Sequence, residues 1–130
     1  MRPPIKKAPS SVIIISDDAG FTHFAGEVLR MDGVKVMVAR DYKEGEYVLE
    51  NTKCNLILLD TAAQRIDAAD SLNKLTHHPM LLDIPVALLI KEEASREDRE
   101  KARAAGAIDC LVKSSGAGAL STGVSRLLTR

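Results

Sequence analysis

The sequence predicts a single α/β domain in which five strands of a parallel sheet alternate with five helices. Short apolar runs rich in β-branched residues alternate with segments of helical period, as expected where a crossover helix follows each strand. Apolar residues make up 45% of the 130 residues, yet the chain has only two Phe, two Tyr and no Trp. An aliphatic core of this kind is typical of a parallel sheet packed between helices. The length suits one domain.

The predicted strands are short apolar runs. The first, residues 11–16, is a continuous β-branched run, which is typical of a strand covered on both faces of a sheet. Pro85 falls near the start of the fourth, where a strand tolerates a residue without an N–H group. In chain order the five predicted strands are residues 11–16, 34–38, 55–59, 84–90 and 107–112.

The first two predicted helices follow the first two strands. Asp32-Gly33 ends the first helix, whose apolar stripe consists of Phe21, Phe24, Ala25, Val28 and Leu29. The second helix covers about residues 41–50. Its Gly45 lowers the intrinsic helix propensity by about 1 kcal/mol relative to Ala, so we expect this helix to be the weakest.

The last three predicted helices have recognisable ends. The third ends near Pro79 and carries the apolar residues Ile66, Ala69, Leu72 and Leu75. The fourth begins at a capping Ser95 and ends at Gly106. The fifth runs from about Gly118 to the C-terminus.

Composition and charge exclude several classes of function. Eighteen basic residues balance eighteen acidic ones, so we expect neither direct nucleic-acid binding nor attraction to an anionic membrane. The apolar runs are far shorter than the roughly 20 residues of a membrane helix. Residues 1–10 are basic and proline-rich, which predicts a disordered N-terminal arm ahead of a domain spanning residues 11–130.

Neither the cysteines nor the paired histidines have the spacing of a metal site. Cys54 and Cys110 stand far apart, which favours two reduced thiols in a cytoplasmic protein. His77 and His78 are neighbours at the end of a predicted helix, and adjacent helical residues point in different directions. Without a third ligand we interpret them as an exposed helix end.

Charged residues follow several strands at their carboxyl ends. Asp17 and Asp18 follow the first strand, Asp60 the third and Lys113 the fifth. Ligands of an open parallel sheet bind beyond the carboxyl ends of its strands, so three carboxylates and an ammonium meet in one pocket. Clustered carboxylates repel one another unless they bind a hard cation, and Mg²⁺ prefers oxygen ligands. The sequence therefore predicts an acidic pocket for Mg²⁺ and phosphate, although any one of these acids alone is explained by the preference of Asp for turns.

Other phosphate-binding or cofactor-binding α/β folds lack their motifs here. The chain has neither a GxxxxGK[ST] loop nor a GxGxxG turn after the first strand, so nucleotides find no backbone cradle. A haloacid-dehalogenase-like phosphatase needs a second Asp where Ala62 stands. The DDAGF loop offers no convincing flavin site.

In order along the chain, the segments IIISDD, LILLD, PVALLI and EDREKARAAGAIDCLVK resemble the CheY-like receiver domain of two-component response regulators. The resemblance covers roughly residues 11–128. It matches Asp17 and Asp18 to the acidic pair of the family, Asp60 to its phosphoacceptor and Lys113 to its phosphate-contacting lysine.

The resemblance implies a flavodoxin-like (βα)5 fold, a doubly wound five-stranded parallel sheet. It also implies that Asp60 accepts a phosphoryl group from a histidine kinase or phosphotransfer protein, which is signal transduction and not enzymatic action on a separate substrate. Mg²⁺ would be held by Asp18, Asp60 and the backbone carbonyl of Ala62, with Asp17 acting through water. The family's kinase contact lies at the start of the first helix, which here presents Gly20, His23 and Glu27.

Three switch positions depart from the family pattern. Ile90, or Lys91 if the register shifts by one, stands where the family has a Thr or Ser hydroxyl. Cys110 replaces the switch aromatic, and Ser114 replaces the proline after the lysine. Two interpretations stay open: a phosphoacceptor that signals by another route, such as a shuttle or sink, or a pseudo-receiver that acts as a protein-interaction module regardless of phosphate.

Overall fold

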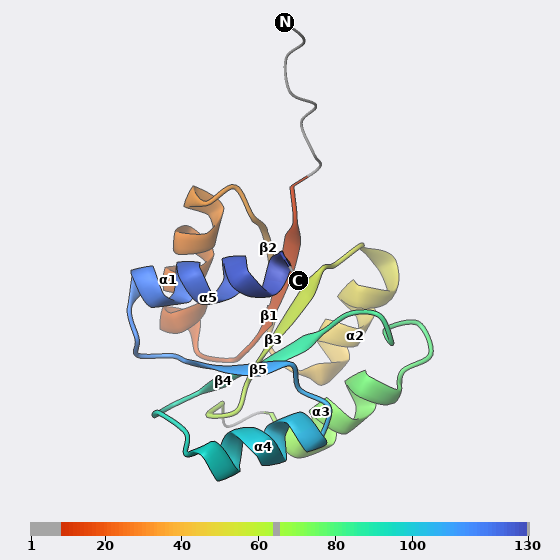
Figure 1. Cartoon of the computed structure of the whole chain (residues 1–130). Coiled ribbons are helices and arrows are strands. Elements are labelled where there is room, and N and C mark those ends of the chain that lie inside the picture. The colour runs from red at the N-terminus through yellow and green to blue at the C-terminus, as the bar shows by residue number, and fades with distance from the viewer. Residues whose placement is uncertain (1–8, 64–65, 130) are drawn as a thin grey trace, which may run out of the picture.

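The computed structural model describes residues 9–63 and 66–129. One sheet of five parallel strands runs through the molecule in the order β2-β1-β3-β4-β5 (Figure 1). The strands are β1 (Ser11–Ile15), β2 (Lys35–Ala39), β3 (Leu56–Asp60), β4 (Val86–Ile90) and β5 (Asp109–Val112). The predicted five-stranded parallel α/β fold is confirmed.

Helices cover both faces of the sheet (Figure 1). One face carries α1 (Ala19–Met31) and α5 (Ala117–Leu128). The opposite face carries α2 (Tyr42–Asn51), α3 (Ala68–His77) and α4 (Arg96–Ala104). This division places one hydrophobic core on each side of the sheet.

Successive residues of the central strands enter opposite cores. In β1, Ile13 packs into the core under α2 and α3, whereas Ile14 packs into the core under α1 and α5. This alternation follows from the two-residue period of a strand. All five residues of β1 and of β3 are buried because both strands are interior and covered on both faces.

Three details of the predicted helices are wrong. Phe24 is 39% exposed, because α1 packs through the line Phe21, Ala25 and Leu29. Ala69 is also exposed. Ile66 is buried but precedes α3, because the side chain of Asp67 accepts a hydrogen bond from the Asp70 N–H and caps the helix there.

The predicted N-terminal arm falls mostly outside the described residues, which begin at residue 9. Pro9 and Ser10 belong to neither a helix nor a strand. Within the described part of the chain, no helix is both long enough and apolar enough to cross a membrane.

Gly45 lets α2 approach β1 closely, which the sequence does not reveal. A Cβ atom at this buried position would lie 2.8 Å from Ile15 Cδ1 and 3.2 Å from Ile15 Cγ1. Gly118 lies in α5 with no heavy atom within 4 Å of such a Cβ. Both are helical glycines, but Gly45 is buried against β1 whereas Gly118 is exposed, so Gly118 serves as the uncrowded control.

We therefore expect Gly45→Ala to lower the free energy of unfolding by about 1 kcal/mol, because the overpacking outweighs the gain in helix propensity. Gly118→Ala should raise it by up to about 1 kcal/mol. Urea unfolding followed by circular dichroism measures both. Stabilisation by Gly45→Ala would show that α2 moves away from Ile15 at little cost.

Candidate functional site

The candidate site lies where β1, β3 and β5 end. Asp60 is the last residue of β3, Asp17 and Asp18 follow β1, and Lys113 follows β5. The strands are parallel, so all of these ends meet at one edge of the sheet. The structure brings Asp18, Asp60 and Lys113 into direct contact there.

Asp60 is fully buried, and three described residues donate hydrogen bonds to it. Its Oδ2 accepts from the Lys113 ammonium at 2.7 Å and from the Ser16 hydroxyl at 2.6 Å. Its Oδ1 accepts from the Ala62 backbone N–H at 2.9 Å. A buried charge is stable only when it is paired and hydrogen-bonded, and each of these bonds supports the ionised carboxylate.

Lys113 connects Asp60 to Asp18. Its Nζ donates to Asp18 Oδ2 at 3.0 Å and lies 5.0 Å from the centre of the Phe21 ring. Burial of the ammonium lowers its pKa, but the hydrogen bonds to Asp60 and Asp18 outweigh burial, so the pKa of Lys113 lies above its ordinary value. The ammonium therefore stays charged at neutral pH.

The Asp18 carboxylate accepts hydrogen bonds from two groups. Its Oδ1 accepts from the Phe21 N–H at 3.0 Å, which makes Asp18 the N-cap of α1, while Oδ2 accepts from Lys113. The pKa of Asp18 is lowered first by the Phe21 hydrogen bond and then by the Lys113 hydrogen bond. Both of its oxygens are thus engaged, which sequence reasoning did not anticipate.

Ser16 is the site residue that sequence reasoning missed. The register pairs Ile15 with Leu59, so Ser16 follows β1 directly beside Asp60. Ser16 is only 1% exposed, and its hydroxyl donates to Asp60 Oδ2. The available signal was a hydroxyl at the end of an otherwise apolar buried strand, since such a group must find a hydrogen-bond partner.

The remaining predicted ligands are Asp17, which follows Ser16 after β1, and Ala62, whose backbone N–H donates to Asp60. Asp17 is half-buried between Ser16 and Asp18, and Ala62 is exposed. The candidate donors are the carboxylates of Asp17, Asp18 and Asp60 and the carbonyl of Ala62. An all-oxygen set of this kind fits Mg²⁺, which prefers a few oxygen ligands completed by water and phosphate.

The three atypical switch positions lack the groups of the family pattern: Ile90 has no hydroxyl, Cys110 has no aromatic ring and Ser114 has no proline ring. Ile90 is the last residue of β4, is half-buried and pairs with Val112 of β5. Cys110 is buried, and burial raises the pKa of its thiol. Ser114 is exposed after β5, and no cis peptide bond occurs in the described residues.

The interpretation of the paired histidines needs correction. His77 is exposed at the end of α3, but the side chain of His78 is only 13% exposed. Its Nε2 lies 3.1 Å from Glu50 Oε1 and 3.5 Å from Glu46 Oε2. His78 Nδ1 accepts from the Met80 N–H, so the ring proton is on Nε2 and donates to Glu50. This hydrogen-bonded tautomer accounts for the cluster without a metal ion.

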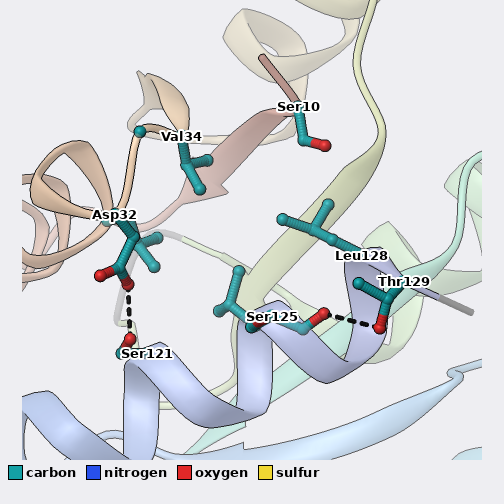
Figure 2. A pocket seen from close by; sticks show the side chains of 10 residues that line it. Ser10, Asp32, Val34, Ser121, Ser125, Leu128 and Thr129 are labelled. Carbon is teal, nitrogen blue, oxygen red and sulfur yellow. Dashed lines mark hydrogen bonds between the residues drawn. The ribbon is translucent and has the colours of Figure 1, made fainter. Parts of the chain in front are cut away.

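A pocket of about 400 Å³ lies at the opposite edge of the sheet (Figure 2). It is bounded by Ser10 and Val34, which precede β1 and β2, and by the last turns of α1 and α5. Asp32 accepts a hydrogen bond from Ser121 at its rim (Figure 2). The pocket is therefore separated from Asp60 by the length of the strands.

Comparisons with known proteins identify the family and the fold of the chain. The model of a protein family described as the response regulator receiver domain matches residues 12–125. The chemotaxis response regulator CheY4 of Vibrio cholerae has 19% identity and a TM-score of 0.83, with 92% of this chain and 99% of that chain covered. A receiver domain protein (CheY-like) from Methanospirillum hungatei JF-1 has 22% identity and a TM-score of 0.79, covering 94% and 95%.

A third solved structure is the signal receiver domain of a histidine kinase from Syntrophus aciditrophicus. It has 25% identity and a TM-score of 0.77, with 92% of this chain and 90% of that chain covered. The comparison with curated protein sequences found no significant match.

Proposed function

Because the chain belongs to the response regulator receiver domain family, we propose that Asp60 accepts a phosphoryl group from a histidine kinase or phosphotransfer protein. The observation that carries this proposal is the contact of Asp60 Oδ2 with the Lys113 ammonium, at 2.7 Å, where the parallel strands have their carboxyl ends. The receiver would span residues 11–130 and act in signal transduction, not as an enzyme on a separate substrate. Both cysteines are free thiols, which suits a cytoplasmic location.

The proposed transfer needs little covalent chemistry from the protein. A carboxylate oxygen of Asp60 attacks phosphorus, an O–P bond forms, and the P–N bond to the partner's imidazole breaks. The imidazole nitrogen keeps the electron pair and takes a proton. Lys113 would offset the negative charge on the phosphoryl oxygens, so the contribution of the pocket is positioning and electrostatic stabilisation.

Mg²⁺ is the cation that we propose for this pocket, held by the acidic pair, Asp60 and the Ala62 carbonyl. Both oxygens of Asp18 are engaged by Phe21 and Lys113. Because a carboxylate oxygen accepts more than one partner, we keep the arrangement that the resemblance implies, in which Asp18 would bind the cation directly and Asp17 would bind it through water. The cation would supply positive charge for the phosphoryl oxygens.

The partner kinase or phosphotransfer protein would dock at the start of α1. Gly20, His23 and Glu27 are all exposed on α1, which begins directly after the acidic pair. His23 Nε2 lies 3.8 Å from Glu27 Oε1, and both side chains are mostly exposed, so a partner can displace this contact.

A second candidate function is a pseudo-receiver that binds proteins regardless of phosphate. The observation that favours it is the closure of the site: Asp60 has no exposed surface and both of its oxygens accept hydrogen bonds. Phosphorylation requires this pocket to open, whereas a protein-interaction module does not.

Mass spectrometry of the intact protein distinguishes the two candidates. After incubation with Mg²⁺ and a small phosphodonor, we expect the wild type to gain the mass of one phosphoryl group and Asp60→Asn to gain none. Chelation of Mg²⁺ should abolish the gain. A folded wild-type protein that takes no phosphate and shows no Mg²⁺-dependent NMR shifts would support the pseudo-receiver instead.

A further inference from the structure

Ser16 joins the Asp60 carboxylate to the first turn of α1. We propose that this residue is a positioning residue that transmits the state of Asp60 to the N-terminus of α1. The coupling itself is a property of the unmodified protein. Its use as a signal rests on the proposed phosphorylation of Asp60.

A continuous series of hydrogen bonds carries the proposal. The Ser16 hydroxyl donates to Asp60 Oδ2 at 2.6 Å and accepts from the Asp18 N–H at 3.1 Å. The Asp18 carboxylate in turn accepts from the Phe21 N–H at 3.0 Å. Ser16 and Asp60 are 1% and 0% exposed, so the first bond of the series is shielded from water in the unmodified protein.

Lys113 provides a second connection between the same two groups. Its ammonium donates to Asp60 Oδ2 and to Asp18 Oδ2 and lies against the Phe21 ring. A change of charge at Asp60 Oδ2 therefore acts on the N-cap of α1 through a hydroxyl and through an ammonium. Phe21 is itself buried in the core that α1 shares with α5.

β4, the strand on the other side of Asp60, is entirely apolar, so none of its side chains bonds the Asp60 carboxylate. β4 ends in Ile90, which has no hydroxyl, and the hydroxyl of Thr61 donates to the Leu89 carbonyl. Ser16 is thus the hydroxyl that reaches Asp60 from a neighbouring strand. We infer that a change at Asp60 moves α1 more than it moves β4 and α4.

Phosphorylation would change what Ser16 and Lys113 bind. When one carboxylate oxygen forms a bond to phosphorus, the carboxylate loses its negative charge and becomes a weaker acceptor. The hydroxyl and the ammonium then turn toward the phosphoryl oxygens, and the Asp18 N–H follows the oxygen of Ser16. The first turn of α1 is the element displaced by these changes.

NMR spectroscopy of single and double variants tests the coupling without phosphate. We expect Asp60→Asn to shift the backbone amide resonances of Asp18 and Phe21. In a Ser16→Ala background the Asp18 shift caused by Asp60→Asn should fall to less than half, because the hydroxyl link is lost. In a Thr61→Val background it should persist in full, since Thr61 does not bond Asp60. A full Asp18 shift in the Ser16→Ala background overturns the proposal.

Hydrogen exchange provides the second measurement. Ser16→Ala removes the acceptor of the Asp18 N–H, so the exchange of this amide should quicken on the order of five-fold, the factor of one hydrogen bond. Ser16→Thr keeps a hydroxyl and should restore the wild-type rate. Unchanged exchange in a folded Ser16→Ala protein, or loss of protection equally in Ser16→Thr, would contradict a positioning role.

Beryllofluoride with Mg²⁺, which imitates a phosphoryl group on a carboxylate, separates this inference from the proposed function. In the wild type we expect larger amide shifts at Asp18 and Phe21 than at Leu89 and Ile90, and Ser16→Ala should reduce the α1 shifts. Shifts centred on β4 would overturn the α1 route. A wild type that does not respond would count against phosphorylation, while the Asp60→Asn cycle still decides whether Ser16 couples the two groups.

Discussion

Replacement of Lys113 by Met is expected to slow phosphorylation of Asp60 by about 10²- to 10³-fold, the usual effect of removing one charge-stabilising donor from an active site. Lys113 is 2.7 Å from Asp60 Oδ2 and stays charged at neutral pH, so it is available to the phosphoryl oxygens. Met keeps most of the side-chain volume and removes the charge. Phosphate incorporation over time, measured by intact mass with a small phosphodonor, gives the rate.

The same substitution should also lower the free energy of unfolding by about 3 kcal/mol, because it leaves the Asp60 carboxylate buried without its cation. Asp60→Asn in the Lys113→Met background should recover most of this loss, since an amide carries no charge. Urea denaturation of the four proteins gives the coupling free energy directly. A double variant no more stable than Lys113→Met would show that the ion pair is not the cause.

Lys74 supplies the matched control. It forms an ion pair with Asp70 at 2.8 Å, but both side chains are about half exposed. We expect Lys74→Met to change stability by less than about 1 kcal/mol and to leave the phosphorylation rate at the wild-type value. If Lys74→Met and Lys113→Met had equal effects on stability and on the phosphorylation rate, the role proposed for Lys113 would be wrong.

Leu58→Ala is expected to lower the free energy of unfolding by about 2–5 kcal/mol, the range found for truncation of fully buried leucines. Leu58 has no exposed surface and lies in the central strand β3, in the core covered by α1 and α5. The cavity left by the truncation would lie against β3, the strand that also carries Asp60. Urea unfolding should show a lower midpoint with an unchanged slope.

Leu82→Ala is the control for this truncation, because Leu82 is 64% exposed. It should change stability by no more than about 0.5 kcal/mol. If Leu58→Ala and Leu82→Ala destabilised the protein equally, burial would not explain the contribution of Leu58 to stability.

Most of the fold was predictable from local patterns. The first strand could be read from four consecutive β-branched residues. The first helix could be read from an apolar stripe, of which Phe21, Ala25 and Leu29 are buried. The errors fall at helix surfaces and ends. Phe24 and Ala69 are apolar residues that the packing leaves exposed, and the start of α3 depends on a cap at Asp67.

The position of the site was also predictable, because a residue that follows a strand of a parallel sheet lies at its carboxyl edge. Asp60 and Lys113 were identified in this way, and they are in contact. The partners of individual oxygens were not predictable. Ser16 is uncharged, so a search for charged residues after the strands does not identify it. No local pattern shows which of Asp17 and Asp18 contacts Lys113.

Local patterns in the sequence are enough to predict the order of the elements and the edge at which the charged residues meet, because periodicity and strand ends are local properties. Long-range packing sets the remaining contacts. Ser16 and Lys113 both donate to Asp60 Oδ2, Asp18 caps α1 while it binds Lys113, and Gly45 leaves space for the side chain of Ile15. The three contacts of the site join residues 44, 53 and 95 positions apart, so they depend on strand register and on packing distance. Neither quantity is encoded in a local pattern, since each is set only when the whole sheet has formed.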